Sequence, residues 1–173
     1  MINAAIVGLG WWGRHIVSSL QGKSGKLRFI RAIDSNAKIE RDFSIENDIQ
    51  FSTDFGDALH DDLVDAVILA TPHSLHVEQI VQAAAAGKHV FSEKPLALGK
   101  ENAIRAVNAC AKEGVILGVG HERRFEPALL EIKNLVDTGA LGTIMHVEAN
   151  FSHDSLATVN AKNWRASKTE SPA

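Results

Sequence analysis

The chain has 173 residues, enough for one domain with part of a second, and it can bury a sizeable core without a disulfide. Its formal charge of −3, with 18 scattered Lys and Arg residues, leaves no basic surface for a nucleic-acid backbone. The single cysteine, Cys110, can neither build a disulfide framework nor hold a zinc ion. No apolar run approaches the roughly 20 residues that cross a bilayer, and no secretory signal is recognisable. We therefore expect a cytoplasmic protein without metal, membrane or nucleic-acid partners.

Five short apolar runs alternate with helix-like stretches over the first 120 residues. The runs cover residues 2–7, 27–33, 66–70, 89–91 and 115–119. Near-continuous apolar runs are typical of strands that helices cover on both faces. The predicted helices run from Gly13 to Gly22, from a cap at Ser74 to Gly87 with Leu75 toward the core, and over 102–113, where Ile104, Val107 and Ala111 form one stripe. This order predicts an α/β fold with a doubly wound parallel sheet.

The pattern changes after Pro127. An amphipathic helix covers 129–136, and the segment TIMHVEANFSH (143–153) then alternates apolar and polar residues, which is typical of a half-exposed antiparallel strand. We expect a first domain over 1–122 and the incomplete start of a second, α+β domain built on an antiparallel sheet over 123–173. A lone strand is not stable, so its partners are expected from further chain or from another molecule.

Three glycines, Gly8, Gly10 and Gly13, form a G-x-G-x-x-G motif between the first run and the first helix. Gly8 permits a tight turn, Gly10 lets the backbone approach a pyrophosphate, and Gly13 lets helix and strand pack closely. Asp34 ends the second run, where a carboxylate accepts hydrogen bonds from ribose hydroxyls and repels a 2′-phosphate. The pattern predicts an NAD site, with NAD preferred over NADP. The alternative is an ordinary turn with a surface aspartate.

Two tryptophans stand inside the glycine motif, and both are candidates for contact with the cofactor. Trp12 falls on the apolar stripe of the first helix, so we expect it to lie mainly toward the core. Trp11 lies off that stripe and is the better candidate for the cofactor side.

Five segments occur together in a characteristic order: GLGWWG, AID (32–34), ILATPHSLH (68–76), SEKPLA (92–97) and VGHERRFEP (119–127). With them, essentially the whole chain resembles the family of glucose-fructose oxidoreductase, inositol dehydrogenase and the rhizopine-catabolism oxidoreductases. The resemblance implies an N-terminal NAD-binding Rossmann domain, followed by a domain with a large antiparallel sheet that commonly forms a homo-oligomer interface. It also implies hydride transfer from a hydroxyl-bearing carbon of a sugar, polyol or related small molecule.

The resemblance assigns roles to individual residues. Thr71, Pro72 and His76 would line the cofactor. Glu93, Lys94 and Pro95 would lie by the nicotinamide ribose, with a cis bond before Pro95. Lys94 would orient the reacting oxygen and help to move its proton, a role that burial of the amine favours. The substrate pocket would comprise His121, Arg123, Arg124, Trp164 and Arg165. Many family members carry Asn in place of His121, so its role stays open, as does that of His73.

One catalytic element of that family is missing, an Asp-x-x-x-His pair that follows a Gly-Gly step. None of the eight histidines has an aspartate four residues before it, and the segment NWRASKTESPA resembles only the approach to that element. We expect the chain to bind NAD but to turn over poorly or not at all by itself. Two alternatives are a stand-alone NAD-binding or regulatory module and a methyltransferase that binds S-adenosylmethionine; the segment EKP at 93–95 argues against the second.

Overall fold

The structure is a computed structural model that describes residues 1–152, 154, 164–167 and 170, except for the side chains of residues 37–41 and 165. The chain divides into two compact units. The first comprises Met1–Gly120 together with Lys168–Ala173, and the second comprises His121–Ser167. Each unit is described by itself below.

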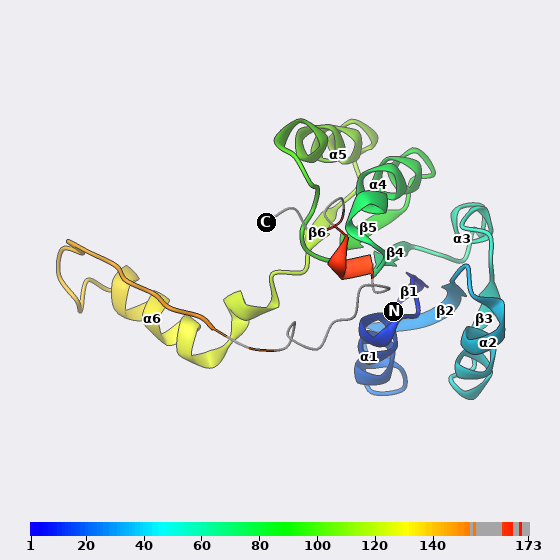
Figure 1. Cartoon of the computed structure of the whole chain (residues 1–173), viewed down its shortest axis with the longest axis horizontal. Helices are drawn as coiled ribbons and strands as arrows, with labels where there is room; N and C mark the ends of the chain where they lie inside the picture. Colours follow the sequence, from blue (N-terminus) through cyan, green and yellow to red (C-terminus); the bar gives the residue numbers. More distant parts are fainter. Residues whose placement is uncertain (153, 155–163, 168–169, 171–173) are drawn as a thin grey trace. The chain divides into compact units, whose positions relative to one another are not determined.

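The first unit is built on a parallel sheet, as the sequence predicts (Figure 1). Its described residues form six strands: β1 (Ile2–Val7), β2 (Leu27–Ile33), β3 (Gln50–Ser52), β4 (Ala66–Leu69), β5 (His89–Ser92) and β6 (Leu117–Val119). Their order is β3-β2-β1-β4-β5-β6, and every neighbouring pair is parallel. This is the doubly wound order with its switch point between β1 and β4.

Helices cover both faces of this sheet (Figure 1). The helices on one face are α1 (Trp11–Leu20) and α2 (Ala37–Glu46). Those on the other are α3 (Gly56–Leu59), α4 (His76–Ala85) and α5 (Lys100–Glu113). A short 3-10 turn, η1 (His73–Leu75), precedes α4. The two faces therefore have separate cores.

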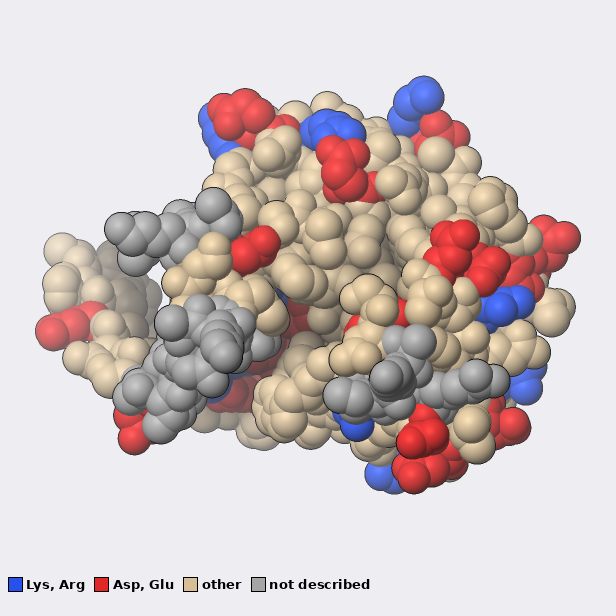
Figure 2. Space-filling view, turned by 45° about the vertical axis from the view of Figure 1, so that its right-hand side comes forward, with Lys and Arg blue, Asp and Glu red and all other residues tan. Residues whose placement is uncertain are grey.

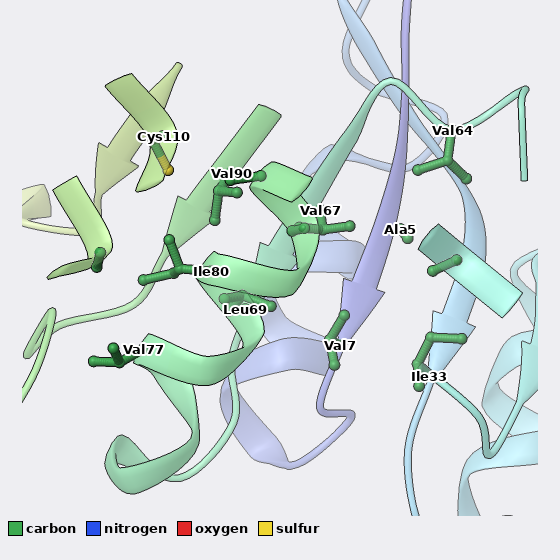
Figure 3. Close-up of a cluster of buried hydrophobic side chains, with 14 residues drawn as sticks. Ala5, Val7, Ile33, Val64, Val67, Leu69, Val77, Ile80, Val90 and Cys110 are labelled. Carbon is green, nitrogen blue, oxygen red and sulfur yellow. The ribbon is translucent and has the colours of Figure 1, made fainter. Parts of the chain in front are cut away.

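Alternate strand residues supply these two cores. On one side Ala5, Val7, Val67, Leu69 and Val90 pack under α4 and α5 (Figure 3). On the other, Ala4, Ile6, Phe29, Ala32 and Ile68 pack under α1. Cys110 belongs to the first core, and burial raises the pKa of its thiol.

Two details of the predicted helices are wrong. Ser74 does not cap α4, which begins two residues later without a side-chain cap, and Leu75 is exposed. The reason is that Ser74 lies within the η1 turn and directs its hydroxyl to Glu170 instead. In α5 the expected core stripe is exposed as well, with Ile104 and Val107 each 48% exposed. The buried face of α5 consists of the smaller residues Ala106 and Cys110.

The second unit differs from the predicted antiparallel sheet. Its helices are η2 (Glu122–Phe125), α6 (Pro127–Asp137) and η3 (Trp164–Ala166), and α6 matches the predicted helix. The described part of the predicted strand, residues 143–152, forms no strand. A strand needs a hydrogen-bonded neighbour, and the described residues of this unit offer none. Met145 and Val147 are consequently 87% and 77% exposed.

Candidate cofactor site

The carboxyl ends of five neighbouring strands lie in one row. Val7 pairs with Ile33 and Leu69, Leu69 pairs with Ser92, and Ser92 pairs with Val119. The next residue of each strand continues the row: Gly8, Asp34, Ala70, Glu93 and Gly120. Open parallel sheets bind ligands at this edge. The glycine motif, Asp34 and the loops that carry Thr71 and Glu93 therefore meet there.

The three glycines of the motif have different structural roles. Gly8 has a φ of +91°, and a Cβ on it would lie 2.6 Å from the Ala70 carbonyl oxygen. A Cβ on Gly13 would lie 1.9 Å from the Gly8 carbonyl oxygen. Gly10 has an ordinary φ of −60°, and its Cβ would meet no atom within 4 Å. The fold requires glycine at positions 8 and 13, whereas at position 10 glycine only leaves space open.

That space adjoins the start of α1. Gly10 is the N-cap of this helix and supplies no side-chain cap, and the first turn contains no acidic residue. The first N–H groups of a helix lack intrahelical partners and favour an anion. Among the described residues, Trp12 Nε1 is also a buried donor without an acceptor. The uncapped helix start beside the open space at Gly10 fits the pyrophosphate of a dinucleotide.

Two side chains fix the loop through the backbone of Leu9. The Leu9 N–H donates to Asp34 Oδ2 at 2.7 Å, and Arg14 Nε donates to the Leu9 carbonyl at 2.9 Å. The Arg14 guanidinium also lies 5.2 Å from the centre of the Phe43 ring on α2. The hydrogen bond from Arg14 to Leu9 was not predicted from the sequence. The signal for it is that side chains in the first turn of a helix point back toward the N-terminus of the helix. Asp34 thus shapes the glycine loop through the backbone of Leu9.

The tryptophans of the motif stack beside this loop. Trp11 is 77% exposed, and its ring centroid lies 5.8 Å from that of His15. Trp12 stacks on His15 from 5.0 Å and is half-buried. Trp12 does not join the core cluster under α1, so its expected place toward the core is not found.

The loops after β4 and β5 are joined by His76. Its ring is fully buried, with Nε2 at 3.0 Å from the Thr71 carbonyl oxygen and Nδ1 at 2.8 Å from the Pro95 carbonyl oxygen. Thr71 Oγ1 in turn donates to Gln79 Oε1 of α4 at 2.6 Å. The bond between Lys94 and Pro95 is cis, as the resemblance implies. A fully buried ring presents no surface to a ligand, so the structure places His76 between the two loops and not along the cofactor, where the resemblance would place it.

The carboxylate of Glu93 lies close to the end of β6. A Cβ on Gly120 would lie 2.8 Å from Glu93 Oε1, so glycine there leaves room for this carboxylate. The Lys94 N–H donates to Glu93 Oε2 at 3.3 Å. The Lys94 side chain itself is exposed, and the described residues do not supply the burial expected for it.

The residues assigned to the substrate pocket belong to the second unit. His121, Arg123 and Arg124 are exposed in or beside η2. Arg123 Nη1 donates to Glu126 Oε1 at 3.0 Å, and its guanidinium lies 4.4 Å from the centre of the Phe151 ring. Trp164 is half-buried in η3, and the Arg165 side chain lies outside the described residues. The structure thus brings Arg123 and Phe151 together within this unit.

Three further observations on the described residues concern metal ions, membranes and surface charge. No three of their His, Cys, Asp and Glu side chains gather where a metal could bind, and none of their helices is long and apolar enough to span a membrane. On the face shown in Figure 2, Lys and Arg are interspersed with Asp and Glu rather than gathered into a basic patch. A hollow of about 680 Å³ lies at the opposite, amino end of the sheet, between Asn3, Arg28 and Gln50, and contains none of the predicted site residues.

The fold and this site define a dinucleotide-binding α/β domain. The family model described as an oxidoreductase family with an NAD-binding Rossmann fold matches residues 2–121. The chain belongs to this family of glucose-fructose oxidoreductase, inositol dehydrogenase and rhizopine-catabolism oxidoreductases. The resemblance that the sequence motifs indicate is thereby confirmed.

Three relatives show how far the similarity extends. The chain is 36% identical to scyllo-inositol 2-dehydrogenase (NAD(+)) of Bacillus subtilis over 90% of its own length and 46% of the relative's. A crystal structure of scyllo-inositol dehydrogenase from Lactobacillus casei with bound NAD(H) and scyllo-inositol has a TM-score of 0.76 at 31% identity, covering 82% of this chain and 42% of that one. A candidate NADPH-dependent oxidoreductase from Desulfitobacterium hafniense has a TM-score of 0.89 at 27% identity, covering 99% and 49%. The chain spans less than half the length of each.

Proposed function

We propose that the chain is the cofactor-binding part of an NAD-preferring dehydrogenase that acts on a hydroxyl-bearing carbon of a sugar, a polyol or a related small molecule. The observation that carries this proposal is the open space at Gly10, beside Asp34 and the uncapped start of α1. Neither the backbone conformation nor the packing requires a glycine at this position. The inositol dehydrogenases among the relatives support the substrate class. We also propose that the longer protein is a homo-oligomer.

The preference for NAD follows from the hydrogen-bonding capacity of Asp34. A carboxylate has about four acceptor sites. Asp34 uses one on each oxygen, for the N–H groups of Leu9 and Asn36 at 2.7 and 2.9 Å. About two sites remain for the two ribose hydroxyls, whereas a 2′-phosphate would meet a like charge. The relative from Desulfitobacterium hafniense carries the name of an NADPH-dependent enzyme, so the preference must be measured rather than transferred.

The bound nicotinamide would accept a hydride from the substrate carbon. The residues of this chain would then have two tasks at that end. First, the contacts of His76 with the Thr71 and Pro95 carbonyls would fix the two loops that frame the nicotinamide ring. Second, the neutral amine of Lys94 would accept a hydrogen bond from the substrate hydroxyl and take up its proton as the carbonyl forms, and the resulting ammonium would donate a hydrogen bond to the carbonyl oxygen.

Removal of the Lys94 amine tests its role in a longer form of the protein that carries the second domain. Lys94→Ala should lower kcat by about 100-fold or more, because a positioned proton-transfer group contributes on that order. The dissociation constant for NADH should change less than about threefold. Lys100→Ala, at the exposed start of α5, is the matched control. An unchanged kcat would reduce Lys94 to a surface residue.

Calorimetric titration tests the cofactor class on the chain itself. NADH should bind, NADPH should bind more weakly, and S-adenosylmethionine should not bind. Binding of S-adenosylmethionine without NADH would replace the proposal by methyl transfer. Equal affinity for NADH and NADPH would overturn the preference but not the cofactor class.

A further inference from the structure

Glu170 is bound to the turn that leads into α4, 96 residues earlier in the chain. The Ser74 N–H donates to Glu170 Oε2 at 3.0 Å, and the Ser74 hydroxyl donates to Glu170 Oε1. His73 Nδ1 lies 2.6 Å from the Glu170 backbone oxygen. Because a carbonyl oxygen only accepts, this ring nitrogen carries the proton. Three hydrogen bonds thus join Glu170 to His73 and Ser74, the first two residues of η1.

The charge of Glu170 suits this position. The Ser74 hydroxyl, followed by the Ser74 N–H and the nearby rings of His73 and His76, holds the pKa of the Glu170 carboxyl below its usual value. Hydrogen bonds to an ionised group are roughly twice as strong as those between neutral groups. The contact is therefore strongest while the carboxylate is ionised and weakens as the pH falls through the lowered pKa.

The turn that receives Glu170 is continuous with the predicted cofactor site. Thr71 and Pro72 precede it directly, and His76 follows it. The centroids of the His73 and His76 rings lie 5.9 Å apart, with the rings edge to face. Since His76 also contacts the Thr71 and Pro95 carbonyls, the Glu170 contact adds a third attachment to the frame of the loops after β4 and β5.

We propose that Glu170 is a positioning residue, whose carboxylate fastens its segment of the chain to the 73–74 turn and steadies the loop that frames the nicotinamide end of the cofactor. The attachment of Glu170 to the turn, called the fastening below, is argued from these hydrogen bonds alone. The effect on the cofactor rests on the proposed function. Sequence reasoning missed this residue because no local pattern connects positions 74 and 170.

The fastening has a spectroscopic signature in the amide proton of Ser74. In the wild-type chain its NMR chemical shift should follow the ionisation of Glu170 and move upfield as the pH falls through a value below the usual range of glutamate. This titration should vanish in Glu170→Gln and persist in the control Glu101→Gln, an exposed residue in the first turn of α5. Hydrogen exchange at Ser74 should accelerate about tenfold in Glu170→Gln. A Ser74 shift that is the same in wild type and Glu170→Gln at all pH values would overturn the fastening.

The positioning effect is measured on the same variants by NADH titration. Glu170→Gln should weaken NADH binding by about three- to tenfold, the size of the loss expected for one ordinary hydrogen bond, because Glu170 acts on the cofactor only through the 73–74 turn. Glu170→Asp, which keeps the charge, should recover part of the affinity. Loss of the Ser74 titration without a change in NADH affinity would overturn the positioning role. If the wild-type chain showed the Ser74 titration but bound no NADH, the proposed function would fail while the fastening remained.

Discussion

Asp34 combines two tasks at the scale of a single residue. One oxygen holds the Leu9 N–H and the other holds the Asn36 N–H, so the carboxylate shapes the glycine loop before any ligand arrives. About two acceptor sites of the carboxylate remain for the ribose hydroxyls under the proposed function. A substitution at Asp34 therefore changes the loop and the selectivity together, and the two effects need separate measurements.

Asp34→Ala should weaken NADH binding by about tenfold or more and NADPH binding by clearly less, because the charge that repels a 2′-phosphate is removed along with the ribose acceptor. The measurement is a titration of each nucleotide, and the ratio of the two dissociation constants isolates selectivity from damage to the loop. Asp62→Ala, an exposed aspartate, is the control. Equal weakening of both nucleotides would mean that Asp34 does not bind the ribose.

The sequence was informative about residues whose roles follow from chain order. The place of Asp34 was predictable, because the carboxyl ends of neighbouring parallel strands meet at one edge. The hydrogen bonds of Arg14 and Asp34 to the Leu9 backbone were not predictable, since they depend on the directions of single backbone groups. The exposure of Lys94 was equally invisible, because no pattern around it reports burial.

At the scale of elements, α1 and β1 approach each other closely through the glycine loop. Gly13 faces the Gly8 carbonyl, so the packing of helix on strand depends on the missing side chain. Gly10, three residues earlier, has no such neighbour. Two chemically identical substitutions should therefore separate the needs of the fold from those of the ligand.

Gly13→Ala should lower the free energy of unfolding by about 3 kcal/mol, because its methyl group would overlap a backbone oxygen. Gly10→Ala should change that free energy by less than about 0.5 kcal/mol, since its φ suits alanine and the space is open. NADH affinity should nevertheless fall about tenfold or more in Gly10→Ala. Urea unfolding and NADH titration of both variants give the comparison, with Gly25→Ala, also unhindered, as control. Retained affinity in Gly10→Ala would place the pyrophosphate elsewhere.

Element prediction succeeded where apolar runs were long and failed where small or polar residues dominate. Five of the six strands follow apolar runs, whereas β3 has three residues, Gln50–Ser52, and was missed together with α2 and α3. The core face of α5 was misassigned because large apolar residues were assumed to face inward. Ala106 and Cys110 of α5 and Ala83 and Ala84 of α4 are buried instead, since small side chains let two helices approach closely.

At the scale of the whole molecule, the two units differ in how they are held together. The first closes two cores around a sheet and joins segments that are distant in sequence by polar contacts, such as that of Arg31 Nε on β2 with Asp61 Oδ2 at 2.6 Å. The described part of the second exposes apolar residues such as Met145 and Val147 along a segment that forms no strand. The sequence pattern of 143–153 predicts a strand, but alternation alone cannot supply the neighbouring strand that the hydrogen bonds require.

The Arg31–Asp61 pair should make the stability of the first unit depend on pH. The Arg31 hydrogen bond, followed by that from the Leu63 N–H, holds the pKa of Asp61 below its usual value. A carboxyl with a lowered folded-state pKa stabilises the fold above its unfolded pKa, and the contribution is lost as the pH falls through the folded value. Asp61→Asn should therefore lower the free energy of unfolding by about 1 kcal/mol at pH 7 and by progressively less below about pH 4. Urea unfolding across this range, with Asp62→Asn as control, measures it; a deficit that stayed constant with pH would contradict the assignment.

The row of strand ends has a practical consequence. The row contains Gly8, Asp34, Ala70 and Glu93, each of which follows a different strand. These strands are separated in sequence and are held side by side by the hydrogen bonds of the sheet. A ligand that bridges several members of the row would clamp those strands together, and at 100 times its dissociation constant it would add about 2.7 kcal/mol to stability. Melting temperature would then report occupancy directly. A thermal-shift survey of nucleotides, followed in the longer protein by sugars and polyols added with the preferred nucleotide, could identify the substrate without an assay for turnover.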